Sequence, residues 1–93
     1  MDRRQLVAAA ARRSDLTQRQ MSQALEALLE AIGQALAAGE TVAISSFGHF
    51  EVREYPGRRL RRFDGPGHYA VGDRWVPVFK SSAALRRRVR MKA

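Results

Sequence analysis

The clearest signals of the fold lie in the sequence Thr41-Val42-Ala43-Ile44-Ser45-Ser46-Phe47-Gly48-His49-Phe50-Glu51-Val52. Its first four residues form a short, β-branched run between glycine and serine residues, which is typical of a strand. We expect a hairpin turn at 47–50, because Gly48 can adopt the positive φ that most residues avoid. In the strand that follows, alternation would bury Phe50 and Val52 on one face and leave the other face in water.

Two helices are expected before this stretch. Asp2 and Gln5 have the spacing of a capping box, so a first helix begins there and ends near residue 13. The same spacing recurs at Thr17, ahead of a second helix in which apolar residues recur at steps of three and four up to about residue 38. Gly39 supplies its stop. The apolar stripe of this second helix consists of Met21, Ala24, Leu25, Leu28, Ile32, Ala35 and Leu36.

The composition changes after the second strand. Residues 56–74 are rich in glycine, proline and arginine and poor in core residues, so they are not expected to pack as an ordinary core. Strand character returns at 75–79, where Pro77 indicates an edge strand or a bulge. Ser82 is placed to cap a last short helix over 83–90.

The charge balance points to a polyanionic partner. Lys and Arg number 17 against 9 Asp and Glu, a net charge of +8, while 45% of the 93 residues are hydrophobic. This combination predicts a folded domain with a cationic surface. Cysteine is absent, and His49 and His68 do not by themselves make a zinc site, so we expect no disulfide, metal or cofactor. Self-association is then the expected source of extra stability for so short a chain.

Several functional classes are disfavoured. The sequence has no GxxxxGK[ST] loop and no evident activated nucleophile, so we expect neither an enzyme nor a small-molecule substrate. No apolar run approaches the roughly 20 residues that span a bilayer, and the first residues lack the apolar region of a secretory signal. We therefore expect a soluble, intracellular protein with no membrane partner.

Arginines are concentrated around the segment 56–74. An extended hairpin there would present cations on both faces and could enter a groove of duplex DNA between the phosphate ridges. The alternative is a solvated loop of mutually repelling charges. The arginines concerned are Arg53, Arg58, Arg59, Arg61, Arg62 and Arg74.

Phe63 follows these arginines directly and precedes the turn-forming run Asp64-Gly65-Pro66-Gly67. An apolar side chain at the tip of a cationic hairpin can insert between base steps and kink the duplex. Alternatively, Phe63 folds back onto Leu60 or Tyr69. A basic arm can also enter folded RNA as a component of a ribosome-associated module, although RNA recognition usually needs more aromatic platforms than this segment offers.

Three segments give the chain a family resemblance: Asp2-Arg3-Arg4-Gln5-Leu6, Ser46-Phe47-Gly48-His49-Phe50 and Val76-Pro77-Val78-Phe79-Lys80. Over nearly its whole length the chain resembles the bacterial HU and integration host factor proteins. The most specific features are the Phe-Gly-x-Phe turn, the Val-Pro-x-Phe return strand and the arm-length interval between Phe50 and Phe79.

The resemblance implies an α+β fold and an intertwined dimer. Its helices would form a base, its three-stranded antiparallel sheet a saddle, and its protruding two-stranded β arms would wrap the minor groove of DNA. The chain would be one domain, 1–93, with a helical dimerisation region at 1–40, a sheet at 41–80 that includes the arm at about 54–75, and a C-terminal helix and tail at 81–93. The dimer core would contain Leu28, Ile32, Phe47, Phe50 and Phe79.

The resemblance also implies roles for individual residues. Phe63 aligns with the arm-tip proline that intercalates in most relatives, and Arg58, Arg59, Arg61 and Arg62 would be its phosphate and minor-groove clamps. Arg53 and Arg74 flank this arm. Arg3, Lys80 and Arg86 match regions where the family's body touches flanking phosphates, and the alternative for such surface residues is a solvated side chain. Departures from the family pattern are Arg61-Arg62-Phe63 in place of Arg-Asn-Pro at the tip, and Gly72-Asp73 in a return strand that usually has lysines.

The function implied is that of a histone-like, nucleoid-associated protein in the bacterial cytoplasm. It would bind duplex DNA largely without sequence specificity, prefer bent, nicked or gapped DNA, and bend and condense it. Integration-host-factor relatives are site-specific heterodimers, whereas HU relatives often self-pair. The broad arginine clamp favours a homodimer here, and one subunit of a heterodimer is the alternative.

Overall fold

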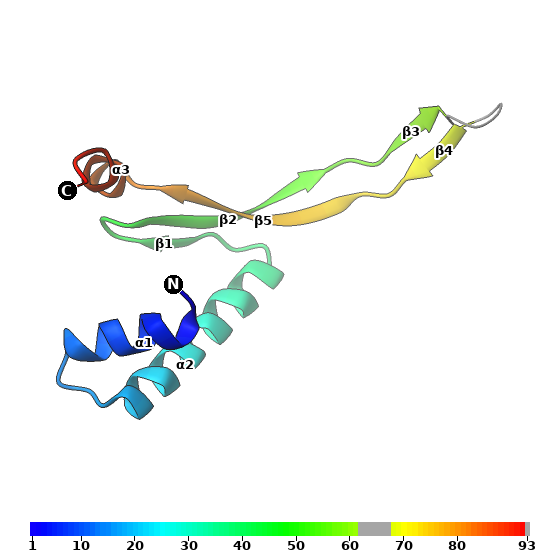
Figure 1. The fold of residues 1–93 in the computed structure, drawn as a ribbon. Helices are drawn as coiled ribbons and strands as arrows, with labels where there is room; N and C mark the ends of the chain where they lie inside the picture. Colours follow the sequence, from blue (N-terminus) through cyan, green and yellow to red (C-terminus); the bar gives the residue numbers. More distant parts are fainter. Residues whose placement is uncertain (62–67, 93) are drawn as a thin grey trace. The chain divides into compact units, whose positions relative to one another are not determined.

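The computed structural model describes residues 1–61 and 68–92 and divides into two compact units, Met1–Ala35 and Leu36–Ala93 (Figure 1). The first unit contains α1 (Arg3–Arg12) and most of α2 (Gln18–Ala37). The second contains five strands and α3 (Ala83–Arg90). Within the described residues this is the α+β class expected from the sequence.

A complete capping box starts α1. The Asp2 carboxylate accepts a hydrogen bond from the Gln5 backbone N–H at 3.0 Å, and the Gln5 side chain accepts one from the Asp2 N–H at 2.8 Å. These contacts satisfy two of the backbone donors that a helix start leaves unpaired. Val7 and Ala11, one turn apart on the same face of α1, are buried.

A second capping box starts α2. The Thr17 hydroxyl accepts from the Gln20 N–H at 3.1 Å, and the Gln20 side chain accepts from the Thr17 N–H at 2.9 Å. The predicted stop is confirmed, because Gly39 has a φ of 80° and its N–H donates to the Leu36 carbonyl at 2.9 Å. None of the 20 residues of α2 is fully buried, and within one chain its apolar stripe is half-buried apart from Leu28, which is exposed.

The three-stranded sheet is antiparallel in the order β1 (Val42–Ile44), β2 (Gly48–Tyr55) and β5 (Arg74–Ser81). The predicted strands are confirmed. Pro77 lies in β5, an edge strand of this sheet, where its missing N–H leaves no gap in an inner ladder.

The predicted position of the hairpin turn is wrong. Ile44 pairs with Gly48, so the turn occupies 45–47, and its left-handed residue is Ser46 with a φ of 63°. Gly48 instead begins β2 and does not have a positive φ. A Cβ at Gly48 would lie 2.7 Å from Cζ of Phe79, so glycine is needed here for close packing, not for a turn.

The arm is a separate two-stranded antiparallel sheet of β3 (Arg58–Arg61) and β4 (His68–Val71), in which Arg58 pairs with Val71. It follows on from β2 and β5 beyond a break at 56–57 and 72–73 (Figure 1). Pro56 has no N–H for a ladder hydrogen bond. At the break, the Gly57 N–H donates instead to the Asp73 carboxylate at 2.5 Å.

The last helix, α3, lies at the end of the sheet away from the arm (Figure 1). The Ser82 hydroxyl caps it by accepting from the Leu85 N–H at 3.0 Å, as predicted. The Ser82 N–H donates to the Phe47 carbonyl at 2.8 Å, which ties the start of α3 to the β1–β2 turn. Of the helices described, none is both long and apolar enough to cross a membrane.

Candidate nucleic-acid interface

The β2–β5 ladder separates a cationic face from an aromatic face. Residues directly opposite each other in an antiparallel pair share a face, and faces alternate along each strand. The pairs His49–Lys80, Arg53–Val76 and Tyr55–Arg74 therefore lie on one face, and Phe50–Phe79 on the other. The cationic face contains three of the predicted contact residues: Arg53, Arg74 and Lys80.

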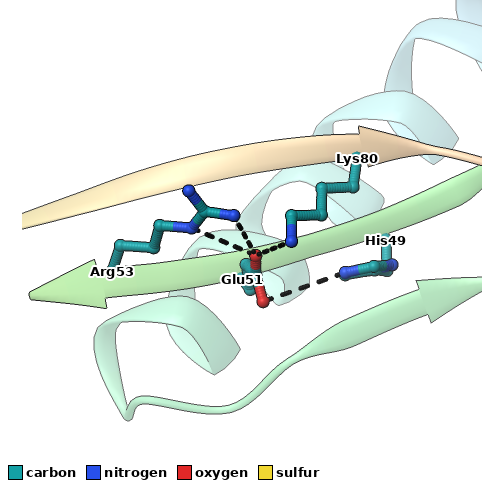
Figure 2. A network of polar contacts seen from close by, with 4 residues as sticks. All are labelled: His49, Glu51, Arg53 and Lys80. Atoms are coloured by element: carbon teal, nitrogen blue, oxygen red, sulfur yellow. Dashed lines mark hydrogen bonds and ion pairs between the residues drawn. The ribbon is translucent and has the colours of Figure 1, made fainter.

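At the centre of the cationic face, Glu51 holds two of these cations (Figure 2). Its Oε1 lies 3.3 Å from Nζ of Lys80 and 3.3 Å from both Nε and Nη2 of Arg53. Its Oε2 lies 3.8 Å from Nε2 of His49. The hydrogen bond from Lys80, with its charge and the contacts of Arg53, lowers the pKa of Glu51 below its usual value of 4.5, against the opposing effect of desolvation.

Arg74 marks the root of the arm on the same face. Its guanidinium carbon lies 5.8 Å from the centre of the Tyr55 ring, a cation–π contact between two exposed side chains. The contact orients the exposed side chain of Arg74. Arg74 is therefore positioned to bind an anion where the body meets the arm.

Within the arm, the structure places the predicted arginines by their backbone. Arg58, Arg59 and Arg61 occupy β3, opposite Val71, Ala70 and His68 of β4. The remaining predicted arm residues, Arg62 and Phe63, lie outside the described residues.

Two further residues predicted to contact DNA, Arg86 and Arg3, lie on the helices α3 and α1. The guanidinium of Arg86, near the start of α3, donates to the Ser81 carbonyl, and the side chain is exposed. In the first unit, Arg3 forms an exposed ion pair with Glu26 of α2. Beside Arg3 is an open groove of about 680 Å³ that also contains Arg4 and Arg19.

The opposite face of the sheet contains the predicted phenylalanine cluster. The ring of Phe79 lies 5.5 Å from that of Phe47 and 4.9 Å from that of Phe50, centre to centre. Although they contact one another, Phe47 remains 45% exposed and Phe79 40% exposed. On α2, Leu28 is 62% exposed and Ile32 is half-buried. The predicted core is therefore incompletely covered in a single chain.

Sequence reasoning missed the contacts of two acidic residues in this region, Glu51 and Asp73. Glu51 shares its face with Arg53 by simple alternation, a signal that the sequence contains. Its second partner, Lys80, is 29 positions away in the sequence, and only the register of β5 brings it there. Asp73 departs from the family pattern, but nothing near it in the sequence indicates its contact with Gly57.

A cationic sheet face that leads into an arginine-bearing β arm, with helices before and after, defines a basic α+β nucleic-acid-binding protein. Residues 1–90 match the family described as "Bacterial DNA-binding protein". The chain belongs to this family, which includes the HU proteins, as the resemblance predicted. It is thus a histone-like DNA-binding protein of the HU type, and the family is one of DNA-binding proteins, not of enzymes.

Individual relatives agree with this assignment. The chain is 36% identical over 86 residues to the DNA-binding protein HU of Staphylococcus aureus, covering 92% of this chain and 96% of that protein. It is 34% identical over 85 residues to HU of Streptococcus thermophilus, covering 91% and 93%.

Solved structures agree as well. The fold matches Anabaena HU in a cocrystal with DNA, with a TM-score of 0.85 and 30% identity, over 99% of this chain and 100% of that chain. It matches HU from Thermotoga maritima with a TM-score of 0.69 and 29% identity, over 96% and 98%.

Proposed function

We propose that the chain forms a homodimer that binds duplex DNA through the minor groove, largely irrespective of sequence, and bends and condenses it. The observation that carries this proposal is the arrangement of the cations. The β2–β5 ladder and the β3–β4 arm together form a ribbon along which arginine recurs, with Lys80 at the body end. The arginines of this ribbon are Arg53, Arg58, Arg59, Arg61 and Arg74.

Phosphate contacts explain why sequence would matter little. Arginine and lysine contacts to phosphates fix the position of a protein on the duplex but carry no direct sequence information. Arg53 and Lys80 have side chains that are 45% and 49% exposed, and Arg74 is exposed as well, so a phosphate can reach all three. The Anabaena relative crystallised with DNA supports DNA as the partner.

Uncovered apolar surface supports the homodimer. Among the side chains that the structure describes, the only buried hydrophobic ones are Val7 and Ala11. This is far less core than a stable domain needs, while Leu28, Phe47 and Phe79 remain exposed. A second copy would offer the same apolar surfaces around a twofold axis. We assign the dimer interface to the helical region 1–40 and the phenylalanine cluster, within a single domain 1–93.

We assign the bending of DNA to Phe63. The argument rests on the sequence, because Phe63 lies outside the described residues, between Arg62 and the run 64–67. Inserting an apolar wedge unstacks a base step at a cost of a few kcal/mol, which further contacts with the bent duplex offset. Nicked or gapped DNA lowers that cost, so it should bind more tightly than intact duplex.

The test compares DNA bending with DNA affinity for Phe63→Ala. On a duplex labelled at both ends, we expect the energy-transfer signal of bending to fall by at least about half at saturation, while affinity falls by less than about tenfold, because the arginines supply most of the affinity. Leu60→Ala, which removes an apolar side chain elsewhere in the arm, should leave bending unchanged.

Unchanged bending in Phe63→Ala would remove the wedge from the proposal. Single-stranded DNA and RNA of the same length serve as further ligands. Binding to RNA that is tighter than to the intact and nicked duplexes would contradict duplex DNA as the ligand.

A further inference from the structure

Glu51 is an acidic residue in the middle of a surface otherwise suited to phosphates. One of its carboxylate oxygens contacts both Arg53 and Lys80, so a single atom serves as the counter-charge for two cations from neighbouring strands (Figure 2). The Glu51 side chain is 26% exposed, whereas those of its two partners are nearly half exposed. The Glu51 carboxylate is thus less accessible to solvent than the two cations that it contacts.

The arrangement has two opposite effects on an incoming phosphate. Glu51 restricts the side chains of Arg53 and Lys80, which lowers the entropy that they lose on binding. It also reduces the local charge from +2 to +1 and repels a phosphate that approaches the same donors. Losing the contacts of Glu51 with Arg53 and Lys80 costs little, because partly exposed ion pairs contribute little free energy. We therefore expect the repulsion between Glu51 and the phosphate to outweigh the entropic benefit of restricting the two cations.

We propose that Glu51 is an internal counter-anion of the DNA interface, which holds Arg53 and Lys80 in the free protein and gives them up to a DNA phosphate in the complex. Glu51 thereby weakens the grip of the sheet face on DNA without altering the arm. This inference rests on the proposed function, since it takes a nucleic-acid phosphate as the competing ligand.

The main test is Glu51→Gln, which removes the charge and keeps the size of the side chain. Duplex affinity is measured by fluorescence anisotropy over a series of salt concentrations. We expect affinity at low salt to rise about three- to tenfold. The slope of log K against log salt should steepen by up to about 2 per dimer, because each protomer gains one net positive charge.

The matched control is Glu54→Gln. Glu54 lies on the same strand and undergoes the same change of charge, but its Cα pairs with that of Trp75, so it belongs to the opposite face of the sheet. We expect its affinity for duplex DNA to change by less than about twofold, because its charge lies away from the cationic face.

A double-mutant cycle separates this role from a structural one. Lys80→Gln should reduce duplex affinity about twofold in the native chain, because Lys80 must give up its contact with Glu51 when it binds a phosphate. In the Glu51→Gln background the same change should reduce affinity about three- to fivefold, since Lys80 then binds a phosphate without losing a contact with a carboxylate. A residue that merely supports the sheet would not produce this coupling.

The inference is overturned if Glu51→Gln lowers duplex affinity, if it raises affinity no more than Glu54→Gln does, or if the cycle shows no coupling. Should Glu51→Gln fail to give the native circular-dichroism spectrum, Glu51→Ala replaces it with the same expected results. Failure of the proposed function is a different outcome, in which the native chain does not bind duplex DNA at all.

Discussion

At the scale of single residues, the identity of Gly48 is dictated by its neighbours on β5, which leave no space for a side chain. A methyl group there would press against the ring of Phe79 and the backbone carbonyl of Lys80. We expect Gly48→Ala to lower the free energy of unfolding by about 2 kcal/mol, because overpacking a close contact forces backbone or ring to move. Urea denaturation at a fixed protein concentration measures the change.

Gly72→Ala is the control for this substitution. Nothing lies within 4 Å of the Cβ that it would add, and Gly72 does not have a positive φ. Its free energy of unfolding should change by less than about 0.5 kcal/mol. Equal destabilisation by the two substitutions would show that the space around Gly48 is not what requires glycine.

The sequence indicated that Gly48 is a special position, but it did not indicate why glycine is required there. Glycine beside phenylalanine and histidine is compatible with a positive φ in a turn, which is a local property. The actual constraint is the ring of Phe79, which arrives from β5, 31 positions later in the sequence. Likewise, the concentration of arginines predicted Arg53 as a cationic contact and the family resemblance implied Lys80, whereas the carboxylate between them depends on strand register.

At the scale of elements, the junction between body and arm depends on Asp73. The ladder is interrupted where Pro56 lacks an N–H, and the Asp73 carboxylate accepts the hydrogen bond of Gly57. We expect Asp73→Ala to speed amide hydrogen exchange at Gly57 and in β3 and β4 by about fivefold or more, because the junction opens more often. The exchange rates are measured by NMR.

Asp73→Asn keeps an acceptor oxygen at the same position and should preserve most of the exchange protection at Gly57. The body strands β2 and β5 should exchange as in the native chain for both variants, since their ladder is continuous. Unaltered exchange at Gly57 in Asp73→Ala would show that this contact does not hold the arm.

Elements whose signals are local were predictable. Both capping boxes, the stop at Gly39, the edge position of Pro77 and the cap at Ser82 follow from short spacings, and all are confirmed. The break in the arm was not predicted, since its closure by Asp73 requires a partner 16 positions away in the sequence. Contacts across strands depend on register, which short patterns do not specify.

At the scale of the whole molecule, the net charge and the exposed apolar surface indicate two different partners. The net charge of +8 favours a polyanion, and the incompletely covered stripe of α2 and phenylalanine cluster favour a second copy of the chain. Family membership was evident from the sequence, because its motifs lie along nearly the full length and residues 1–90 match the family.

A dimer that grips duplex DNA through many arginine contacts to phosphates must lose affinity steeply as the salt concentration rises. The most direct test is the affinity of the purified chain for one duplex, measured over a series of salt concentrations. With about 6 to 10 phosphates neutralised per dimer, log K should fall linearly with log salt at a slope of roughly −5 to −9. A slope near −1 would mean that the cations of the ribbon do not engage the DNA backbone, contrary to the proposed function.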